Sequence, residues 1–468
     1  MQILRPYQLD HIDRLQDCVR QGHRIIVAQA PTGSGKTTIA AEIARRAAAK
    51  GRRTLFLVHR RKLVDQISDR LRDHGVDHGV MMRGEHWSRS HAVQVASRDT
   101  LLSRCVRNEW IGMPPADLIQ VDEAHHAADK DSEYRKILTA YPQATVLLWT
   151  ATPVGTNGAG LGPWATAIEC ASPTSQLVRQ GHLCPVKVFA PERTTEGNRE
   201  LAGDLVDSWR KYAESRPTVL FLGRVANSKE AVAAFTGADI PAAHMDASTP
   251  DDKRDEIFDG IRSGKYLVLS NVGIVGEGVD VPELGCCQLY CEVAGRVAWL
   301  QRVGRVMRPS PGKTYGIVID HSGAVFRHGF PDEDTDWTLE GDQDAAYKKK
   351  HDSGETGDTN YCRFCELVYP RAAKCPQCGR EKVKPPPSVF APPVDVDPDA
   401  PLTEAQRQSR EQIWSLQEQR LHWRRCQAIV KKRGGGYRGA AEIWKKKYGR
   451  YPGSEVTQGN PGVVSESA

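Results

Sequence analysis

The chain has 468 residues, of which 40% are hydrophobic and 26% are charged, with twelve cysteines and a formal net charge of +6. This length allows about three domains, and no apolar run approaches the ~20 residues of a membrane span. The N-terminal "MQILRPYQLDH" lacks the apolar stretch of a signal peptide. We therefore expect a cytoplasmic protein with no membrane partner, whose cysteines are thiols or metal ligands and not disulfides.

Positive charge is concentrated at the C-terminal end of the chain. Residues 401–468 hold 13 lysines and arginines against 6 acidic residues, an excess of seven positive charges, so residues 1–400 carry a net charge of −1. This uneven balance predicts a polyanionic partner that meets the C-terminal segment first.

Apolar runs alternate with helical patterns in two parts of the chain, which predicts two doubly wound α/β lobes with buried parallel strands. Residues 1–170 form the first lobe, with the runs "RIIVAQA", "TLFLVH", "AVQVAS", "DLIQVDE" and "TVLLWTAT". A connector is expected over residues 171–190. The second lobe covers residues 191–330, with the runs "PTVLFLG", "KYLVLSN", "CCQLYCE" and "TYGIVID".

The composition changes after the second lobe. We expect a linker over 331–360, a cysteine module over 361–382, a Pro-rich spacer over 383–401, a basic helical segment over 402–452 and a disordered tail over 453–468. Aromatic residues are interleaved with the cations of the basic segment, an arrangement suited to stacking on bases. Alternatively, Ala441, Trp444 and Tyr448 share a helical face and form a small core.

A phosphate-binding loop is predicted in "RIIVAQAPTGSGKTT", where a strand, a glycine-rich loop and a helix start follow one another. The glycines let backbone N–H groups curl around phosphate oxygens, Lys36 reaches the β- and γ-phosphates, and Thr37 ligates Mg²⁺. The strict pattern is missed at Ala30, where a glycine is expected. The predicted nucleotide-binding residues here are Thr32, Gly33, Ser34, Gly35, Lys36, Thr37 and Thr38.

Two carboxylates follow another apolar run, in "DLIQVDEAHH". Asp122 is placed to hold Mg²⁺ directly or through its water shell, and Glu123 is placed to accept a proton from the attacking water. The alternative for two carboxylates beside two histidines is a metal cluster, which a position after a phosphate loop disfavours.

The stretch "QRVGRVMR" at 301–308 carries three arginines on an expected helix. At 100° per residue, Gln301, Arg305 and Arg308 fall within an arc of about 60°, and apolar residues cover the opposite side. A solvated face is the alternative explanation for this charge. In a cleft between two lobes, Arg305 and Arg308 instead reach the γ-phosphate, and Gln301 helps to hold the attacking water.

Taken in order, "LRPYQ", "APTGSGKT", "DEAH", "TATP", "LSNVGIVGEGVDVP" and "QRVGRVMR" resemble the motifs of the superfamily 2 DEAD/DEAH-like helicases and translocases. The resemblance covers about residues 2–325 and implies two tandem RecA-like lobes that bind ATP and Mg²⁺. Within the superfamily, the chain is most similar to RadD-like and restriction-motor-like bacterial and phage proteins.

The resemblance also implies roles for residues outside the phosphate loop. Arg5 and Gln8 would read adenine, with an ordinary N-terminal helix cap as the alternative. Gly278 and Asp280 would complete the second lobe's contribution, with Asp280 near the ribose. The residues implied to touch the nucleic-acid backbone are Arg61, more weakly Arg60, and Thr100. Thr150 and Thr152 are implied to couple the nucleotide site to strand binding. For the three threonines, a role in a helix cap or turn is the alternative.

The cysteine module reads "YCRFCELVYPRAAKCPQCGR", two C-x₂-C pairs separated by nine residues. Two such turns present four thiolates tetrahedrally, so the spacing predicts a structural Zn²⁺ in a zinc-ribbon-like module; an iron–sulfur centre or redox pair is the alternative. The predicted ligands are Cys362, Cys365, Cys375 and Cys378.

These features predict an ATP-dependent nucleic-acid helicase or translocase, with DNA favoured over RNA on the family resemblance alone. The alternatives are an ATP-gated clamp that binds nucleic acid or protein without separating strands, and an RNA helicase. A protein partner at the cysteine module or the basic C-terminal segment is a further expectation.

Overall fold

The computed structural model describes residues 3–85, 87–107, 112–128, 132–155, 159–191, 201–274, 281–341, 359–370 and 372–381, together with 423, 426, 440, 441 and 445. Residues 1–392 make up one unit of the chain and residues 393–468 a second. No helix among the described residues is long and apolar enough to cross a membrane. The predicted basic helix, the Pro-rich spacer and the disordered tail lie outside the described residues, apart from the five isolated positions after 422.

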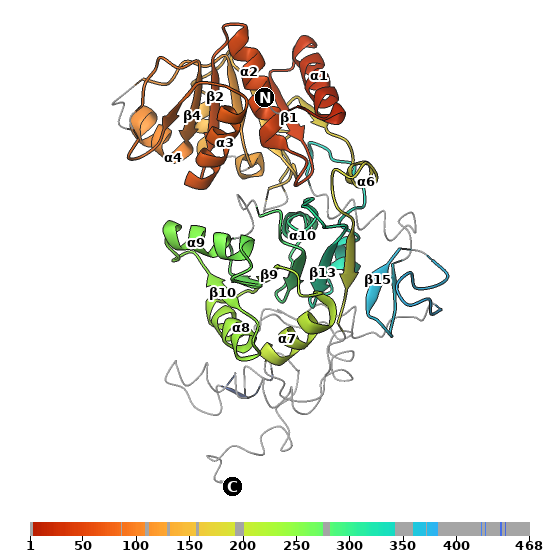
Figure 1. The fold of residues 1–468 in the computed structure, drawn as a ribbon. Helices are drawn as coiled ribbons and strands as arrows, with labels where there is room; N and C mark the ends of the chain where they lie inside the picture. Colours follow the sequence, from red (N-terminus) through yellow and green to blue (C-terminus); the bar gives the residue numbers. More distant parts are fainter. Residues whose placement is uncertain are drawn as a thin grey trace. The chain divides into compact units, whose positions relative to one another are not determined.

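The first lobe carries β1, β2 and β4 in Figure 1. It is built on a sheet of seven parallel strands in the order β3-β4-β2-β5-β6-β1-β7. The strands are β1 (Ile25–Gln29), β2 (Thr54–Val58), β3 (His78–Met81), β4 (Val93–Ser97), β5 (Leu118–Val121), β6 (Thr145–Thr150) and β7 (Ala167–Cys170). The five predicted apolar runs form β1, β2, β4, β5 and β6. The two strands without a predicted run, β3 and β7, lie at the edges of the sheet, where shorter and more polar strands suffice.

Both faces of this sheet are covered, as expected for parallel strands linked by crossover helices. Ile26 and Ala28 pack with α1 (Pro6–Arg20), α2 (Lys36–Ala49) and α3 (Arg61–Asp73) in one core cluster. Val27, between them on β1, packs in a second cluster on the opposite face. The helices of that face are α4 (Arg98–Leu101), η1 (Leu102–Arg107), η2 (Ala124–Ala127) and α5 (Glu133–Leu138).

The second lobe contains a sheet of eight strands in the order β10-β11-β9-β12-β13-β8-β15-β14. The strands are β8 (Val186–Phe189), β9 (Thr218–Phe221), β10 (Ala242–Met245), β11 (Val268–Asn271), β12 (Cys286–Leu289), β13 (Gly316–Asp320), β14 (Asn360–Tyr361) and β15 (Leu367–Tyr369). The first six run parallel, whereas β15 pairs antiparallel with both β8 and β14. The helices are α7 (Leu201–Tyr212), α8 (Val225–Gly237), α9 (Asp251–Arg262), α10 (Arg296–Val303) and α11 (Ala324–His328).

The structure corrects the predicted boundaries around the second lobe. The expected connector over 171–190 contains α6 (Thr174–Arg179) and also β8, which pairs with β13 inside the second sheet. The expected cysteine module over 361–382 is not a separate body, because β15 adds to β8. Val368 faces one core cluster of this lobe, and Leu367 faces the other. Short strands of this kind gain stability only by pairing with distant residues, which sequence pattern does not reveal.

The expected linker over 331–360 also differs from the structure. Its first residues return to the first lobe, where Gly162 N donates a hydrogen bond to Leu339 O at 2.8 Å and Gly341 forms a β-bridge with Ala159. Asp334 accepts hydrogen bonds from the amide and hydroxyl groups of Ser175, at 3.0 and 2.6 Å. The chain therefore crosses between the lobes a second time through an acidic, ordered segment.

Candidate active site

The loop between β1 and α2 has the backbone conformation of a phosphate cradle. Gly33 and Gly35 adopt φ values of +85° and +87°, in the left-handed region that strongly favours glycine. A Cβ atom on Gly35 would lie 2.6 Å from Nε2 of Gln8. The loop ends where α2 begins, so its amide groups meet the positive end of a helix dipole, which favours an anion there.

The first turn of α1 holds this loop in place. Tyr7 donates its hydroxyl hydrogen to the carbonyl of Ser34 at 2.6 Å, and Gln8 Nε2 donates to the same carbonyl at 3.2 Å. Arg5 N in turn donates to Gln8 Oε1 at 3.0 Å, which forms a capping box at the start of α1. The capping interaction is therefore present, and the same glutamine also contacts the phosphate loop.

Lys36 lies among the charges that a nucleotide site requires. Its Nζ donates to the carbonyl of Ala30 at 3.2 Å. Desolvation lowers the pKa of Lys36, the carboxylates of Glu123 and Asp122 raise it, and the guanidinium groups of Arg308 and Arg305 lower it. Two arginines of the second lobe are thus electrostatic neighbours of the first lobe's lysine.

The two predicted carboxylates follow β5 directly. Burial and the neighbouring Glu123 raise the pKa of Asp122 to about 6, while Lys36 opposes the shift. Glu123 adopts φ 49° and ψ 49°, a left-handed conformation that side chains with a Cβ rarely take, and its amide donates to Asp122 Oδ1 at 2.9 Å. Backbone strain of this kind persists where the surrounding fold enforces it. Both carboxylates lie near enough to Lys36 to raise its pKa.

The second lobe's contribution differs from the helix expected over 301–308. Helix α10 ends at Val303, and the chain then turns with Arg305 N donating to Arg302 O at 3.4 Å and Val306 N to Val303 O at 3.0 Å. Glycine at position 304 disfavours a continuing helix. Arg305 and Arg308 therefore extend from turns after α10, although Val303 and Val306 are buried as the helical pattern predicted.

This turn approaches the phosphate loop closely. A Cβ atom on Gly304 would lie 2.7 Å from Cβ of Thr32, and one on Gly33 would lie 3.1 Å from Cγ of Arg308. A residue with a Cβ atom at position 304 would therefore prevent this close approach, and the stem of Arg308 lies against the loop. The third arginine, Arg302, faces away and contacts Cys291 Sγ at 3.3 Å, a structural position.

A series of polar contacts joins Glu123 to the second lobe through a residue that the sequence analysis did not select. His125 Nδ1 lies 3.4 Å from Glu123 Oε2 and 3.5 Å from Thr150 Oγ1. Thr150 donates its hydroxyl hydrogen to Thr152 O at 2.8 Å, and Gln301 Nε2 donates to Thr152 Oγ1 at 3.3 Å. The signal for His125 was its place in "DEAH", two residues after the expected base.

One pocket of about 470 Å³ brings these groups together. It is lined by fourteen of the predicted nucleotide and catalytic residues: Arg5, Gln8, Thr32, Gly33, Ser34, Gly35, Lys36, Thr37, Thr38, Asp122, Glu123, Gln301, Arg305 and Arg308. Gly278 and Asp280 lie outside the described residues. Side chains of α3 that the sequence analysis did not select, including Gln66 and Arg70, also line the pocket.

The residues predicted to touch the nucleic-acid backbone, Arg61, more weakly Arg60, and Thr100, do not line this pocket. Arg60 and Arg61 line a second pocket of about 970 Å³ between α3 and α9, and Lys62 forms an ion pair there with Asp255 at 2.8 Å. Arg61 is also paired with Glu85 at 3.4 Å. Thr100 is half-buried on α4 and lines neither pocket.

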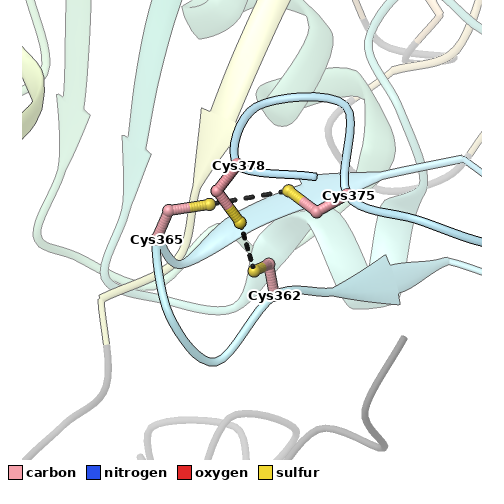
Figure 2. A group of neighbouring side chains, drawn as sticks. All are labelled: Cys362, Cys365, Cys375 and Cys378. Atoms are coloured by element: carbon pink, nitrogen blue, oxygen red, sulfur yellow. Dashed lines mark hydrogen bonds between the residues drawn. The ribbon is translucent and has the colours of Figure 1, made fainter. Parts of the chain in front are cut away.

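The four predicted cysteine ligands converge at the end of β14 and in the loops on either side of β15 (Figure 2). Their sulfur atoms all lie within 4.8 Å of one another. Cys362 Sγ is 3.4 Å from Cys378 Sγ, and Cys365 Sγ is 3.6 Å from Cys375 Sγ. In the described part of the chain, this is the one group of three or more side chains suited to hold a metal ion.

Comparison with protein families gives two matches. Residues 2–155 match the family described as type III restriction enzyme, res subunit, and residues 201–310 match the helicase conserved C-terminal domain. The first match covers the strands and loops that carry Lys36, Asp122 and Glu123, and the second covers those that carry Gln301, Arg305 and Arg308.

Individual relatives come from phage, yeast and archaea. A 51.5 kDa protein of a Lactococcus phage is 30% identical, covering 75% of this chain and 77% of its own length. The putative ATP-dependent helicase IRC3 of Saccharomyces cerevisiae is 27% identical over 69% of this chain, and the putative DNA 3'-5' helicase Rad25 of Haloarcula marismortui is 27% identical over 66%. The chain spans about half the length of these two helicases.

Two solved structures share the fold. A fragment of a putative HsdR subunit of a type I restriction enzyme from Vibrio vulnificus has a TM-score of 0.57 and 20% identity, covering 71% of this chain and 67% of that one. The type ISP restriction-modification enzyme LlaBIII bound to DNA has a TM-score of 0.53 and 16% identity, covering 68% of this chain and 28% of that one.

Proposed function

The chain belongs to the superfamily 2 helicases and restriction-enzyme motors, and we propose that it hydrolyses ATP in the 470 Å³ pocket to step along DNA. The observation that carries the proposal is the composition of that pocket, which joins a phosphate loop and two carboxylates of one lobe to two arginines of the other.

In this proposal the first lobe binds the nucleotide. Amide groups of the loop around Gly33 and Gly35 hold the phosphates, and Lys36 neutralises the β- and γ-phosphate oxygens. Gln8 and Arg5 line the same pocket and are proposed to contact adenine. Binding through Gln8 would require its amide to serve the base in addition to the Ser34 carbonyl that it already contacts.

The residues present also fit Mg²⁺. The Thr37 hydroxyl and the Asp122 carboxylate line one pocket, and the raised pKa of Asp122 reflects a desolvated carboxylate beside a second one, a setting that a divalent cation stabilises. When bound, the ion would supply Lewis-acid stabilisation of charge on the phosphate oxygens.

Hydrolysis is proposed to use groups from both lobes. Glu123 accepts a proton from the water that attacks the γ-phosphorus, and Gln301 orients that water. Arg305 and Arg308 offset the negative charge that develops on the transferred phosphoryl group. Because the arginines belong to the second lobe, their contribution depends on how closely the lobes approach.

The contacts from Glu123 through His125, Thr150 and Thr152 to Gln301 would couple the presence of the γ-phosphate to the contact between the two lobes. Loss of the γ-phosphate would remove the anion that both arginines contact, and the lobes would separate. If each lobe holds the strand, through Arg61 and Thr100 in the first, alternate closing and opening moves one grip past the other.

We further propose that the cysteine group holds one structural zinc ion. Four Zn–S bonds of about 2.3 Å in tetrahedral geometry separate the sulfurs by about 3.8 Å, close to the observed 3.4 and 3.6 Å. Four thiolates leave no open coordination position, so the proposed role is structural. The ribbon-like hairpin would stabilise the β8 edge of the second sheet, and the basic C-terminal segment would add nucleic-acid affinity.

An ATPase assay with single-stranded DNA, duplex DNA, forked DNA and RNA tests the proposal. We expect stimulation by DNA and its loss in Lys36→Ala, and displacement of a triplex-forming strand along duplex DNA would demonstrate stepping without strand separation. Equal stimulation by RNA would favour an RNA helicase. DNA binding that depends on ATP but shows neither displacement nor unwinding would favour the clamp.

A further inference from the structure

We infer that the cysteine hairpin is itself a contact site for single-stranded nucleic acid, with Phe364 as a stacking platform for a base and with Arg363, Lys374 and Arg380 as phosphate partners. This inference rests on the proposed function and extends it, because it gives the motor a further contact with its strand at the edge of the second lobe's sheet.

The side chain of Phe364 is exposed and lies outside the hydrophobic core clusters of the second lobe. Its exposed fraction is 56%, and it is the one aromatic residue among the large, exposed hydrophobic residues of the described chain. The neighbouring hairpin residues Tyr361, Leu367 and Tyr369 are buried against the second lobe. Packing therefore explains these three residues and does not explain Phe364.

The position of Phe364 is nevertheless well defined. It lies between two of the clustered cysteines, in a turn that is closed by hydrogen bonds from Glu366 N to Cys362 O at 2.7 Å and from Cys362 N to Leu367 O at 3.0 Å. An aromatic ring on a short, closed turn loses little conformational entropy when a base stacks on it.

A cation from the second cysteine turn lies against the ring. The guanidinium carbon of Arg380 is 3.8 Å from the centroid of Phe364, within the range of cation–π contacts. Arg380 is anchored at its own backbone, because its carbonyl accepts a hydrogen bond from Cys375 N at 2.8 Å. An aromatic face next to an arginine is the pairing that single-strand binding proteins use for bases and phosphates.

The charge distribution of the hairpin favours a polyanion over a basic or neutral partner face. Arg363, Lys374 and Arg380 are all exposed. Glu366 is turned toward the second lobe, where it pairs with Lys211 at 3.1 Å and accepts a hydrogen bond from the Tyr212 hydroxyl. Glu381 is the one exposed acidic residue among residues 359–370 and 372–381. The exposed residues of the hairpin therefore carry an excess of positive charge, and one of the cations, Arg380, lies against the exposed aromatic ring.

A single strand fits this surface better than a duplex does. Stacking requires a free base face, which a duplex hides in its own stack, whereas phosphate contacts alone would accept either form. A short turn with one ring provides room for one stacked base, so we expect no sequence preference and a modest share of the total affinity.

Binding of fluorescently labelled oligo-dT and oligo-U, measured by anisotropy without nucleotide, tests the inference on the full-length chain. We expect Phe364→Ala to weaken binding by about tenfold and Phe364→Trp to retain it. Val19→Ala is the matched control, because Val19 is an exposed apolar residue of α1 with an exposed fraction of 42%. Zinc content should equal the wild-type value in every variant, which excludes loss of the hairpin.

A salt series separates the two kinds of contact. Arg380→Gln should reduce the slope of log affinity against log salt by about 0.7, the value for one phosphate contact on a single strand. Phe364→Ala should leave the slope unchanged, because stacking releases no counterion.

Unchanged affinity in Phe364→Ala with intact zinc would overturn the inference, and Phe364 would then be a candidate contact for a protein partner. DNA-stimulated ATPase activity in the same protein would still support the proposed function. If the wild-type chain binds neither oligonucleotide and shows no stimulated ATPase, the proposed function itself fails.

Discussion

The two lobes have the same arrangement of strands and different chemistry. The first strand of each lobe follows the same neighbour in its sheet: β1 lies between β6 and the edge strand β7, and β8 lies between β13 and β15. After β1 the chain forms a glycine-rich loop that leads into α2, whereas after β8 it continues through Ala190 and Pro191, which have no such pattern. The phosphate site thus depends on one loop and not on the fold that carries it.

The edges of the two sheets differ as well. In the first sheet β7 runs parallel to β1, but in the second sheet β15 runs antiparallel to β8 and carries the cysteine hairpin. An exposed sheet edge is open to unwanted pairing. In the second lobe, β8 is covered by a hairpin whose four thiols can bind a metal ion. The place that β7 takes in the first sheet is therefore taken in the second sheet by a strand that belongs to a candidate metal site.

The largest expected effect concerns the cysteine hairpin at the edge of the second sheet. We expect one zinc per chain, and Cys378→Ser should abolish its binding, because structural zinc contributes roughly 10–16 kcal/mol of apparent binding energy in small domains. Metal analysis measures the zinc, and hydrogen exchange measures local order. Since β15 pairs with β8, protection should fall in β8 and remain in β1.

Cys18→Ser is the control for this prediction, because Cys18 lies on α1 in the first lobe. It should retain one zinc per chain. Absence of zinc from the wild-type protein, or iron with visible absorbance, would rule the zinc assignment out.

The next prediction divides the ATP chemistry between the lobes. Arg308→Ala should retain ATP binding and lose about 10³-fold or more in hydrolysis rate, because an arginine finger acts on charge in the transition state. Lys36→Ala should lose both binding and hydrolysis. A fluorescent ATP analogue measures binding, and single-turnover phosphate release measures hydrolysis.

Arg302→Ala is the matched control, since Arg302 stacks on Phe221 at 5.4 Å and contacts Cys291 away from the pocket. It should change the hydrolysis rate little. Equal losses of ATP affinity in Arg308→Ala and Lys36→Ala would contradict the division of roles between the lobes.

A smaller effect is expected where the acidic crossing segment meets the first lobe. A Cβ atom on Gly160 would lie 2.1 Å from the backbone oxygen of Leu339, so Gly160→Ala must displace the segment. We expect a loss of about 1–3 kcal/mol in unfolding free energy, the usual range for overpacking. Denaturant unfolding measures it, and Gly237→Ala at the end of α8, where no atom lies within 4 Å, should be neutral or slightly stabilising.

The smallest expected effect comes from a region outside both sheets. Deleting residues 401–468 removes seven net positive charges, and should weaken nucleic-acid binding more than it lowers the ATPase rate at saturating nucleic acid. Each lost phosphate contact should flatten the salt dependence by about 0.7 on single strands and about 0.9 on duplex DNA. An unchanged slope in a salt series would mean that this segment serves a protein partner.

Much of the nucleotide site could be predicted from the sequence because its residues occur in short runs at the ends of apolar strands. Lys36 and Thr37 follow β1, and Asp122 and Glu123 follow β5, which lies two strands away in the sheet. The carboxyl ends of parallel strands share one edge, so a strand prediction is enough to bring such groups together. The predicted helix over 301–308 was wrong beyond Val303, because helical periodicity continues through a turn of similar pitch.

The sequence by itself determined the parallel strands, the glycine loop, the paired carboxylates and the cysteine spacing, because each is encoded by residues close together in the chain. Only the tertiary structure decided that β15 extends β8, that residues 331–341 return to the first lobe, and that His125 connects Glu123 with Thr150. It also decided that the turn after α10 contacts the phosphate loop through Gly304 and Thr32. These contacts join distant segments, and their energy comes from packing and pairing that no local pattern of residues specifies.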